Sequence, residues 1–208
     1  MAFVLPQFPV GSVVFPHTPV ELRVFEPRYL ALMGELMVSE RPVFGIPLFG
    51  QSVDPDNAPE VPTFGTAVHV DDFGVTDDFM GINGTGTKRY VVTKWLEPGP
   101  YPRAEVEYLP ELQWDEQLES ERMMLELEVR NLLARVERHG QLVRGSETEV
   151  SAEPIESLWQ LASLLPIQPI ELVPLLAADS ASELIEGTRA LCAGGQAFMD
   201  EFETNNSD

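Results

Sequence analysis

The prolines of this chain are distributed very unevenly, and their positions constrain the fold more than any other feature. They crowd residues 6–62 and 98–110, whereas the stretch from Asp115 to Gly145 has none. Proline cannot donate the backbone hydrogen bond on which helix interiors and central strands depend, so it collects at turns, edges and helix starts. The pattern predicts a turn-rich β part followed by a helical part, in a chain of 208 residues that suits one large domain or two small ones.

The first half of the chain shows the alternation of apolar and polar residues that is typical of half-buried strands. Val20–Phe25, for example, alternates along its whole length. Strands are predicted in short pieces within residues 3–25 and at residues 43–49, 63–70, 80–83, 88–95 and 103–109. Gly84-Thr85-Gly86 is predicted as a hairpin turn. Residues 50–62 and the acidic residues 71–79 are predicted as surface loops.

A helical period replaces this alternation at two places. Glu26-Pro27 is predicted to open a short helix that ends near Ser39, because proline is tolerated in the first turn. Beyond Asp115, which can cap a helix, apolar residues recur at helical spacing. The residues of this stripe are Leu118, Leu125, Val129, Leu132 and Val136. Gly140 is predicted to end the helix as its C′ residue.

Three further helices are predicted after this one. The first runs from Ser151 to a stop at Pro166. The second opens at Pro169, and Pro174 is expected to bend or shorten it. The third starts at Ser180-Ala181-Ser182-Glu183, a capping-box pattern. Together with the helix after Asp115, they predict a four-helix region.

The charge and the single cysteine narrow the class of protein. Acidic residues outnumber basic ones by 34 to 13, a net charge of −21, which disfavours nucleic acid and anionic membranes as partners. Cys192 alone cannot form an intramolecular disulfide, which fits a reducing cytoplasm. The first residues lack the basic n-region of a signal peptide, and no apolar run is long enough to span a membrane. We expect a cytoplasmic protein that binds no membrane.

Residue types that could carry catalysis are present, but their spacing does not fit such a site. Gly84-Thr85-Gly86-Thr87-Lys88 lacks the spacing of a phosphate-binding loop, and strand-like residues follow it. The histidines, His17, His69 and His139, are far apart, which disfavours a zinc site. Cys192 has no basic neighbour in the sequence, which favours a buried thiol over a nucleophile. We predict no enzymatic activity, no metal and no cofactor.

Several short motifs, in order along the chain, resemble one known family. They begin with Leu5-Pro6-Gln7-Phe8-Pro9, Phe15-Pro16 and Phe25-Glu26-Pro27-Arg28-Tyr29. Weaker matches follow at Phe64–Ala67, Gly86–Tyr90, Tyr101–Val106 and Leu175–Asp179. Together they resemble the N-terminal, substrate-binding domain of Lon proteases. The phosphate-binding loop and the serine–lysine pair of a whole Lon protease are not found in this sequence.

The resemblance implies an α+β fold: a PUA-like mixed β pseudobarrel followed by a C-terminal helical bundle. The β-rich part, with one short helix, is expected at residues 1–112, and the helical part at 113–208. The resemblance also implies a non-catalytic recognition module whose partner is unfolded polypeptide or another protein, with a link to proteolysis or quality control. The sequence leaves the oligomeric state open.

Two groups of residues are candidates for the site. Apolar side chains beside the predicted loops suit the binding of exposed hydrophobic polypeptide, since recognition residues concentrate on loops. They are Phe44, Phe49, Phe73, Phe79 and Met80. The alternative is that they plug the ends of the barrel. The motif residues Phe25, Glu26, Pro27, Arg28 and Tyr29 are read as structural, with Glu26 and Arg28 as an ion pair and cap; a ligand contact is the alternative.

Two other functions stay open at this point. PUA-like barrels also bind RNA, which would require a local basic patch. Arg23, Arg28, Lys88 and Arg89 are the residues that could form it. A hydrolase with an unrecognised site would require a cleft with converging titratable groups.

Overall fold

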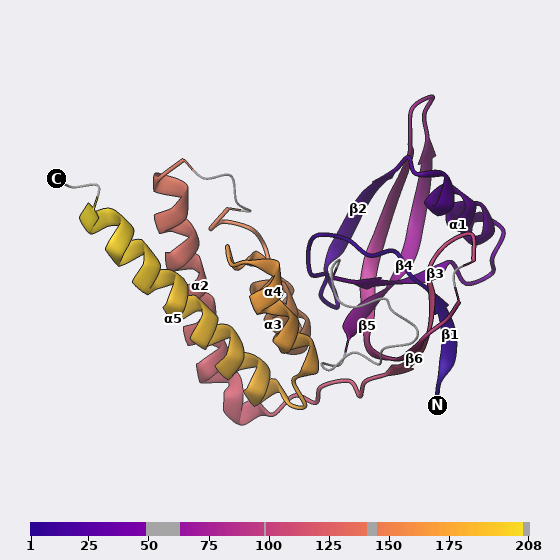
Figure 1. The fold of residues 1–208 in the computed structure, drawn as a ribbon. Helices are drawn as coiled ribbons and strands as arrows, with labels where there is room; N and C mark the ends of the chain where they lie inside the picture. Colours follow the sequence, from indigo (N-terminus) through magenta and orange to yellow (C-terminus); the bar gives the residue numbers. More distant parts are fainter. Residues whose placement is uncertain (49–62, 98, 141–144, 206–208) are drawn as a thin grey trace. The chain divides into compact units, whose positions relative to one another are not determined.

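The computed structural model describes residues 1–48, 63–97, 99–140 and 145–205. The chain divides into two compact units, Met1–Glu111 and Leu112–Asp208. The first, here called the β unit, is built mainly of strands, and the second, the helical unit, is built of helices (Figure 1). The predicted α+β fold class is therefore confirmed. Within the described residues, no helix is both long and apolar enough to cross a membrane.

A single antiparallel sheet forms the β unit. Its strands are β1 (Phe3–Pro6), β2 (Pro19–Val24), β3 (Val43–Pro47), β4 (Phe64–Val75), β5 (Met80–Trp95) and β6 (Arg103–Tyr108). The order is β1-β6-β5-β4-β3, and β2 pairs with β5. Isolated parallel bridges, Gln7 to Gly45 and Val10 to Leu48, join the segment after β1 to β3. The two ends of the sheet are thus brought together into a pseudobarrel, which leaves fewer free edges.

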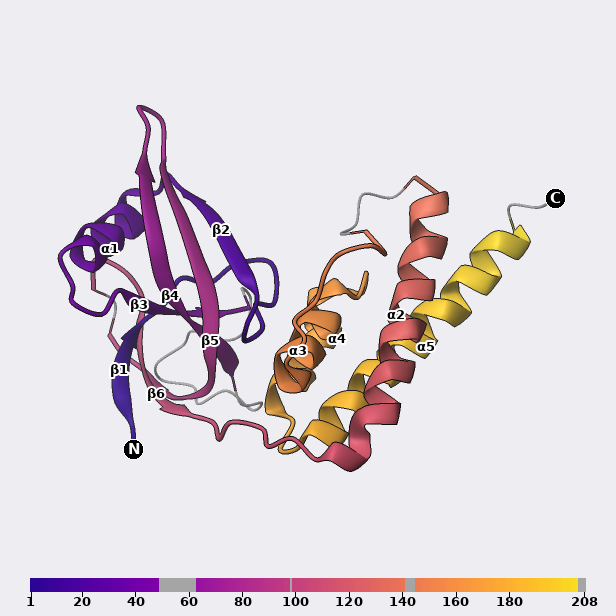
Figure 2. The same cartoon turned by 180° about the vertical axis from the view of Figure 1, so that it is seen from behind.

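The hairpin of β4 and β5 is longer than the sequence predicted. Residues 71–79 were expected as an acidic loop, but β4 continues to Val75 and only residues 76–79 turn. The Asp71 carboxylate accepts a hydrogen bond from the Thr85 hydroxyl on β5 at 2.8 Å. Asp71 is polar and exposed, but it can lie within the strand because its hydrogen-bond partner is on the neighbouring strand. The hairpin projects from the barrel as a narrow extension (Figures 1 and 2).

The predicted turn at Gly84-Thr85-Gly86 was wrong, since these residues lie inside β5. Their glycines allow close approach instead of a turn. A Cβ at Gly84 would lie 2.6 Å from the carbonyl oxygen of His69, and one at Gly86 would overlap the carbonyl oxygen of Phe15. The Gly86 amide donates to Thr18, and the Gly86 carbonyl accepts from His17. Position 86 therefore fixes the segment before β2 against the sheet.

Helix α1 (Pro27–Met37) closes the core of the barrel, and it begins at the predicted proline. Its Leu32, Met33 and Leu36 are buried with apolar side chains of β2 to β5. The Tyr101 hydroxyl donates to the Glu35 carboxylate of α1 at 2.5 Å. The helix is therefore held by apolar packing on one face and by a tyrosine at its flank.

A second part of the core contains a buried polar pair. The Tyr90 hydroxyl donates to Gln7 Oε1 at 2.6 Å, and Gln7 Nε2 donates to the Leu5 carbonyl at 3.1 Å; both side chains are fully buried. Gly45 and Gly65 make room for the Tyr90 ring end, because a Cβ at either position would overlap the hydroxyl. A buried pair whose hydrogen bonds are satisfied favours one register of β1 over others.

All four tyrosines of the chain lie in this unit, and burial is the main cause that raises their pKa values. They are Tyr29, Tyr90, Tyr101 and Tyr108, and the pKa of Tyr101 rises to about 12. A tyrosine whose folded pKa lies above the unfolded value, about 10, stabilises the fold below that pH. This contribution is then lost as the pH rises through the folded pKa. We expect less tyrosinate absorbance at pH 10 in the folded protein than in the unfolded chain, and stability that falls as the pH rises above 10.

The control for this titration is the chain unfolded in urea, in which all four phenols should ionise near pH 10. A tyrosine that ionises at pH 10 while the far-ultraviolet circular dichroism stays native would contradict the burial described above. Tyr101→Phe should remove the component that titrates near pH 12.

The helical unit contains α2 (Glu119–Arg138), α3 (Pro154–Leu164), α4 (Pro169–Leu172) and α5 (Ala181–Asn205). Short 3₁₀ turns, η1 (Glu116–Leu118) and η2 (Val173–Ala177), precede α2 and follow α4. Helices α2 and α5 run side by side in the same direction (Figures 1 and 2). Arg189 pairs with Glu128 near one end, and Arg135 pairs with Asp200 and Glu203 toward the other.

The predicted helix signals are confirmed at several ends. The Asp115 carboxylate accepts from the Gln117 amide at 2.9 Å, at the start of η1. Gly140 has a positive φ of 73°, the left-handed conformation expected after a helix. The Glu183 amide donates to the Ser180 hydroxyl, as a capping box requires. Pro174 lies in η2, so α4 is short, as predicted.

Candidate recognition surface

The aromatic and methionine side chains that were predicted to bind polypeptide do not share one environment. Phe44 is fully buried among the core residues of the barrel, so its side chain is not accessible to a partner. It lies in β3, whose residues from Phe44 to Pro47 are all buried, which the sequence alone did not reveal. Phe49 lies outside the described residues. Phe73 and Met80 are half-buried and pack against the core, as the barrel-plug alternative holds.

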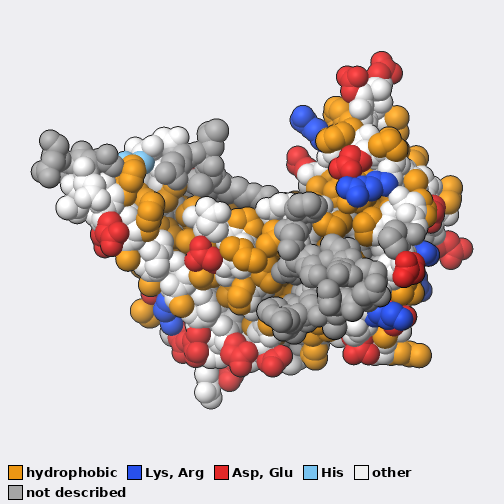
Figure 3. All heavy atoms as spheres, viewed as in Figure 1, with side chains coloured by type: hydrophobic (Ala, Val, Ile, Leu, Met, Phe, Trp, Pro, Cys, Tyr) orange, Lys and Arg blue, Asp and Glu red, His pale blue; other side chains and the backbone are white. Residues whose placement is uncertain are grey.

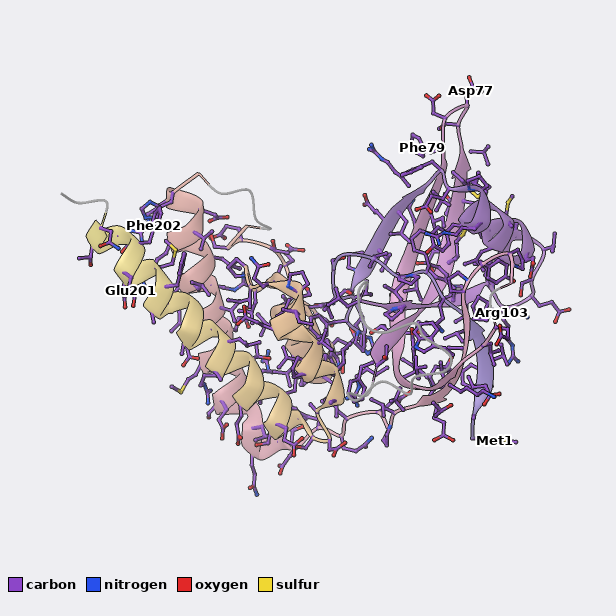
Figure 4. All side chains as sticks on the ribbon, in the orientation of Figure 1. Met1, Asp77, Phe79, Arg103, Glu201 and Phe202 are labelled. Carbon is purple, nitrogen blue, oxygen red and sulfur yellow. The ribbon has the colours of Figure 1, made fainter. Side chains whose placement is uncertain are left out.

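Phe79 lies on the outer face of the hairpin, near the acidic tip that Asp77 marks (Figure 4). It is half-buried, and the Arg23 guanidinium carbon lies 5.3 Å from the centre of its ring. Such a cation–π contact holds an aromatic ring in place while leaving an edge free for contact. The ring thus contacts β2, although Phe79 belongs to the turn before β5.

The strand register brings an exposed phenylalanine to the same place. Val24, the last residue of β2, pairs with Met80, the first residue of β5. Phe25 directly follows this pair on one chain segment, and Phe79 directly precedes it on the other. The Phe25 side chain is 67% exposed, although the sequence assigned it a structural role.

Near Phe79, two paired positions of the hairpin are glycines. Gly81 pairs with Arg23 on one side and with Gly74 on the other. A Cβ at Gly74 would meet no atom within 4 Å, and one at Gly81 would lie 3.7 Å from the Gly74 carbonyl oxygen and 3.8 Å from Phe79 Cε2. The two glycines therefore leave a bare strip of backbone beside the Phe79 ring. We call Arg23, Phe25, Gly74, Phe79 and Gly81 the hairpin surface.

Acidic side chains lie at both ends of the hairpin surface. Glu21 and Asp72 both pair with Asn83, two residues beyond Gly81, and both are exposed. Asp77 and Asp78 are exposed at the turn. Figure 3 shows acidic side chains at the tip of the hairpin, with apolar and basic ones below. The surface thus combines aromatic contact area with negative charge.

The other motif residues lie at the start of α1. Arg28 and Glu26 form the predicted ion pair at 2.9 Å, with each side chain about half exposed. Glu26 is the N-cap residue of α1, but its side chain makes no capping hydrogen bond, so that part of the prediction was wrong. Tyr29 is buried, and its ring packs 4.2 Å from that of Phe8. Pro27 occupies the first turn of α1, as expected.

The four basic residues that could have formed an RNA-binding patch have separate environments. Arg89 is buried and donates to the Pro110 carbonyl. Lys88 pairs with Glu111, and Arg28 pairs with Glu26. Arg23 lies over Phe79. Carboxylates thus offset the charges of Lys88 and Arg28, while Arg89 is buried.

Titratable side chains show little sign of activation. Burial raises the pKa of the Cys192 thiol to about 11, whereas a nucleophilic cysteine requires a lowered pKa. His69 and His139 contact Asp71 and Glu203, respectively, in different units. Among the residues that the structure describes, no three His, Cys, Asp or Glu side chains are grouped as a metal site would require.

One known protein family matches most of the chain. Residues 4–189 match the substrate-binding domain of ATP-dependent protease La (LON). The chain belongs to the Lon substrate-binding domain family. This match covers most of the chain and confirms the resemblance that the motifs between Leu5 and Tyr29 suggested. A comparison with curated proteins finds no match.

Solved structures of Lon N-terminal domains have the same fold. A Lon N-terminal domain protein from Xanthomonas campestris is 24% identical, with a TM-score of 0.60, and the match covers 90% of this chain and 98% of that one. The N-terminal domain of the Lon protease from Mycobacterium avium complex is 14% identical, with a TM-score of 0.63 and coverage of 92% and 98%. The likeness supports the Lon-type arrangement of sheet and helices.

Proposed function

We propose that this Lon-type domain is a non-catalytic recognition module that binds extended segments of unfolded polypeptide on the hairpin surface. The observation that carries the proposal is the exposed Phe25 side chain, which directly follows the last β2–β5 pair, Val24 with Met80, at the end of the strands where Gly74 and Gly81 also pair. Exposed aromatic side chains on a rigid scaffold contribute much of the energy of protein interfaces. The family description, a substrate-binding domain of a protease, supports a role before proteolysis or in quality control.

The surroundings of the surface favour certain segments over others. A bare strip formed by Gly74 and Gly81 can accept a bulky apolar side chain flat against the backbone. Glu21 and Asp72 lie next to that strip and attract positive charge. The expected ligand is therefore a segment that combines aromatic or aliphatic side chains with lysine or arginine. The single cysteine of the chain supports a reducing compartment such as the cytoplasm.

Phe25→Ser tests the proposal directly. The variant should bind a fluorescently labelled, reduced and alkylated model protein at least about tenfold more weakly, because an aromatic anchor contributes 1.4 kcal/mol or more. Its stability should change by no more than about 0.5 kcal/mol, since the side chain is exposed. Fluorescence anisotropy at constant ionic strength measures the affinity, and thermal unfolding measures the stability.

The matched control is Val38→Ser. Val38 is 85% exposed and belongs to the same unit, but it follows the other end of α1. It should leave the affinity unchanged. Equal affinities for the wild type and Phe25→Ser, or equal losses in the two variants, would rule out the hairpin surface as the binding site.

A further inference from the structure

The helical unit contains a groove that lies outside the hairpin surface. It has a volume of about 500 Å³ and lies between α2, α5 and the turn that leads into α4. Its walls are mainly apolar, with Leu132 and Val136 from α2, Ile167 from the turn, and Leu191, Phe198 and Met199 from α5. This volume falls within the range of about 300–1,000 Å³ in which protein sites hold ligands.

Two consecutive glycines in α5 explain why the space is there. Gly195 packs directly on Leu132, since its missing Cβ would lie only 2.8 Å from Leu132 Cδ2. A Cβ at Gly194 would meet no atom within 4 Å, so this residue borders open space. Each glycine costs a helix interior about 1 kcal/mol relative to alanine. Packing against Leu132 explains why residue 195 is a glycine. No packing contact within the unit explains the glycine at position 194.

Phe198 makes the groove an exposed apolar feature. It lines the groove, yet its side chain is 63% exposed, and its ring stacks near that of Phe202 on the next turn. An exposed phenylalanine at the mouth of an apolar groove resembles the anchor positions of protein interfaces. The groove therefore has both the space and the rim that an inserted side chain requires.

Charge indicates which partner fits. The helical unit has 6 arginines and no lysine against 19 acidic residues, a net charge of −13. Four of these arginines, Arg122, Arg130, Arg135 and Arg189, already pair with carboxylates of the same unit. The polar side chains that line the groove are Gln168 and Glu171. If a second copy of this chain bound here, two helical units, each with a net charge of −13, would face each other. Their repulsion opposes self-association on this face.

The walls also indicate how the partner binds. They are formed by helices whose backbone groups are already hydrogen-bonded, so an added strand has no edge to extend. Side chains at positions i and i+3 or i+4 of an incoming helix project from one face and can enter such a groove together. Figure 3 shows apolar side chains over this unit with acidic ones around them.

We propose that the groove beside Gly194 binds the apolar face of a basic amphipathic helix of a partner protein. Apolar side chains of the partner fill the space above Gly194 and contact Phe198. Its lysines or arginines lie near Glu171 and the acidic surface of the unit. This site lies in a different unit from the hairpin surface and does not depend on the function proposed there.

The probe is a fluorescein-labelled helical peptide of leucine and lysine, with leucines at i, i+3, i+4 and i+7. Gly194→Phe should weaken its binding at least about tenfold, because the new ring fills the groove in the way an anchor side chain would. The matched control is Ala193→Phe, which adds the same ring at the neighbouring exposed position that does not line the groove. That variant and Phe25→Ser should bind the peptide as the wild type does.

A charge exchange tests the second half of the proposal independently of the glycine. Glu171→Lys should weaken the leucine–lysine peptide and strengthen a leucine–glutamate peptide of the same pattern, each by about three- to tenfold. Circular dichroism confirms that each variant stays folded. The proposal is overturned if Gly194→Phe and Ala193→Phe behave alike, or if both peptides bind the wild type equally. Occupancy by a second copy, seen as concentration-dependent sedimentation that Gly194→Phe abolishes, would also overturn it.

Discussion

Gly86→Ala is expected to lower the free energy of unfolding of the β unit by about 3 kcal/mol, the upper end of the usual cost of overpacking. The new Cβ would overlap the backbone carbonyl oxygen of Phe15, and a backbone atom cannot rotate away as a side chain does. Relief would require the loss of the hydrogen bonds that Gly86 makes with His17 and Thr18. Native-state hydrogen exchange of the β5 amides measures the change, because these amides open with the whole sheet.

Gly34→Ala is the control for this substitution. Gly34 lies in the middle of α1, and a Cβ there would meet no atom within 4 Å. Alanine should therefore stabilise the same unit by about 1 kcal/mol, since glycine is the weaker helix former. If both variants changed the stability by the same amount and sign, the close approach at Gly86 would not be the reason for its glycine.

Leu125→Ala is expected to destabilise the helical unit by about 2–5 kcal/mol, the range for a leucine that leaves a cavity in a core. Leu125 is fully buried on α2. The measurement is urea unfolding followed by circular dichroism at the helix minimum, because most helical residues belong to this unit. The midpoint should fall while the slope with denaturant stays constant.

Leu127→Ala serves as the comparison, because it removes the same atoms two residues further along the same helix. Leu127 is 61% exposed, so the loss of its side chain should change the stability by no more than about 0.5 kcal/mol. Similar costs at the two positions would mean that α2 does not turn the predicted stripe toward the core.

The features that the sequence predicts well are those that one residue or one period specifies locally. Gly140 ends α2 because a residue without a Cβ adopts positive φ at little cost, and that preference needs no distant partner. The capping box at Ser180 and Glu183 is equally local. The order of motifs from Leu5 to Tyr29 identified the family and, with it, the pseudobarrel.

The features that the sequence predicts poorly depend on contacts between segments that are distant along the chain. Gly84 and Gly86 look like a turn, but they are glycines because Phe15 and His69 lie against them. Phe44 could not be distinguished from an exposed aromatic until β3 was placed in the sheet. The hairpin surface likewise exists only because β2 pairs with β5 and sets Arg23 over Phe79, 56 positions further along the chain.

The pairing of β1 with β6 has a consequence for synthesis of the protein. Phe3 pairs with Val106, so the first strand has no partner until the last strand of the sheet has emerged from the ribosome. At translation rates of roughly 5–20 residues per second, this interval lasts roughly 5–20 seconds. During that time β3, β4 and β5 can pair with one another, and the edge of β5 that β6 will cover has no partner. The nascent chain therefore exposes an open sheet edge for seconds, which is the interval in which a co-translational chaperone would be most useful.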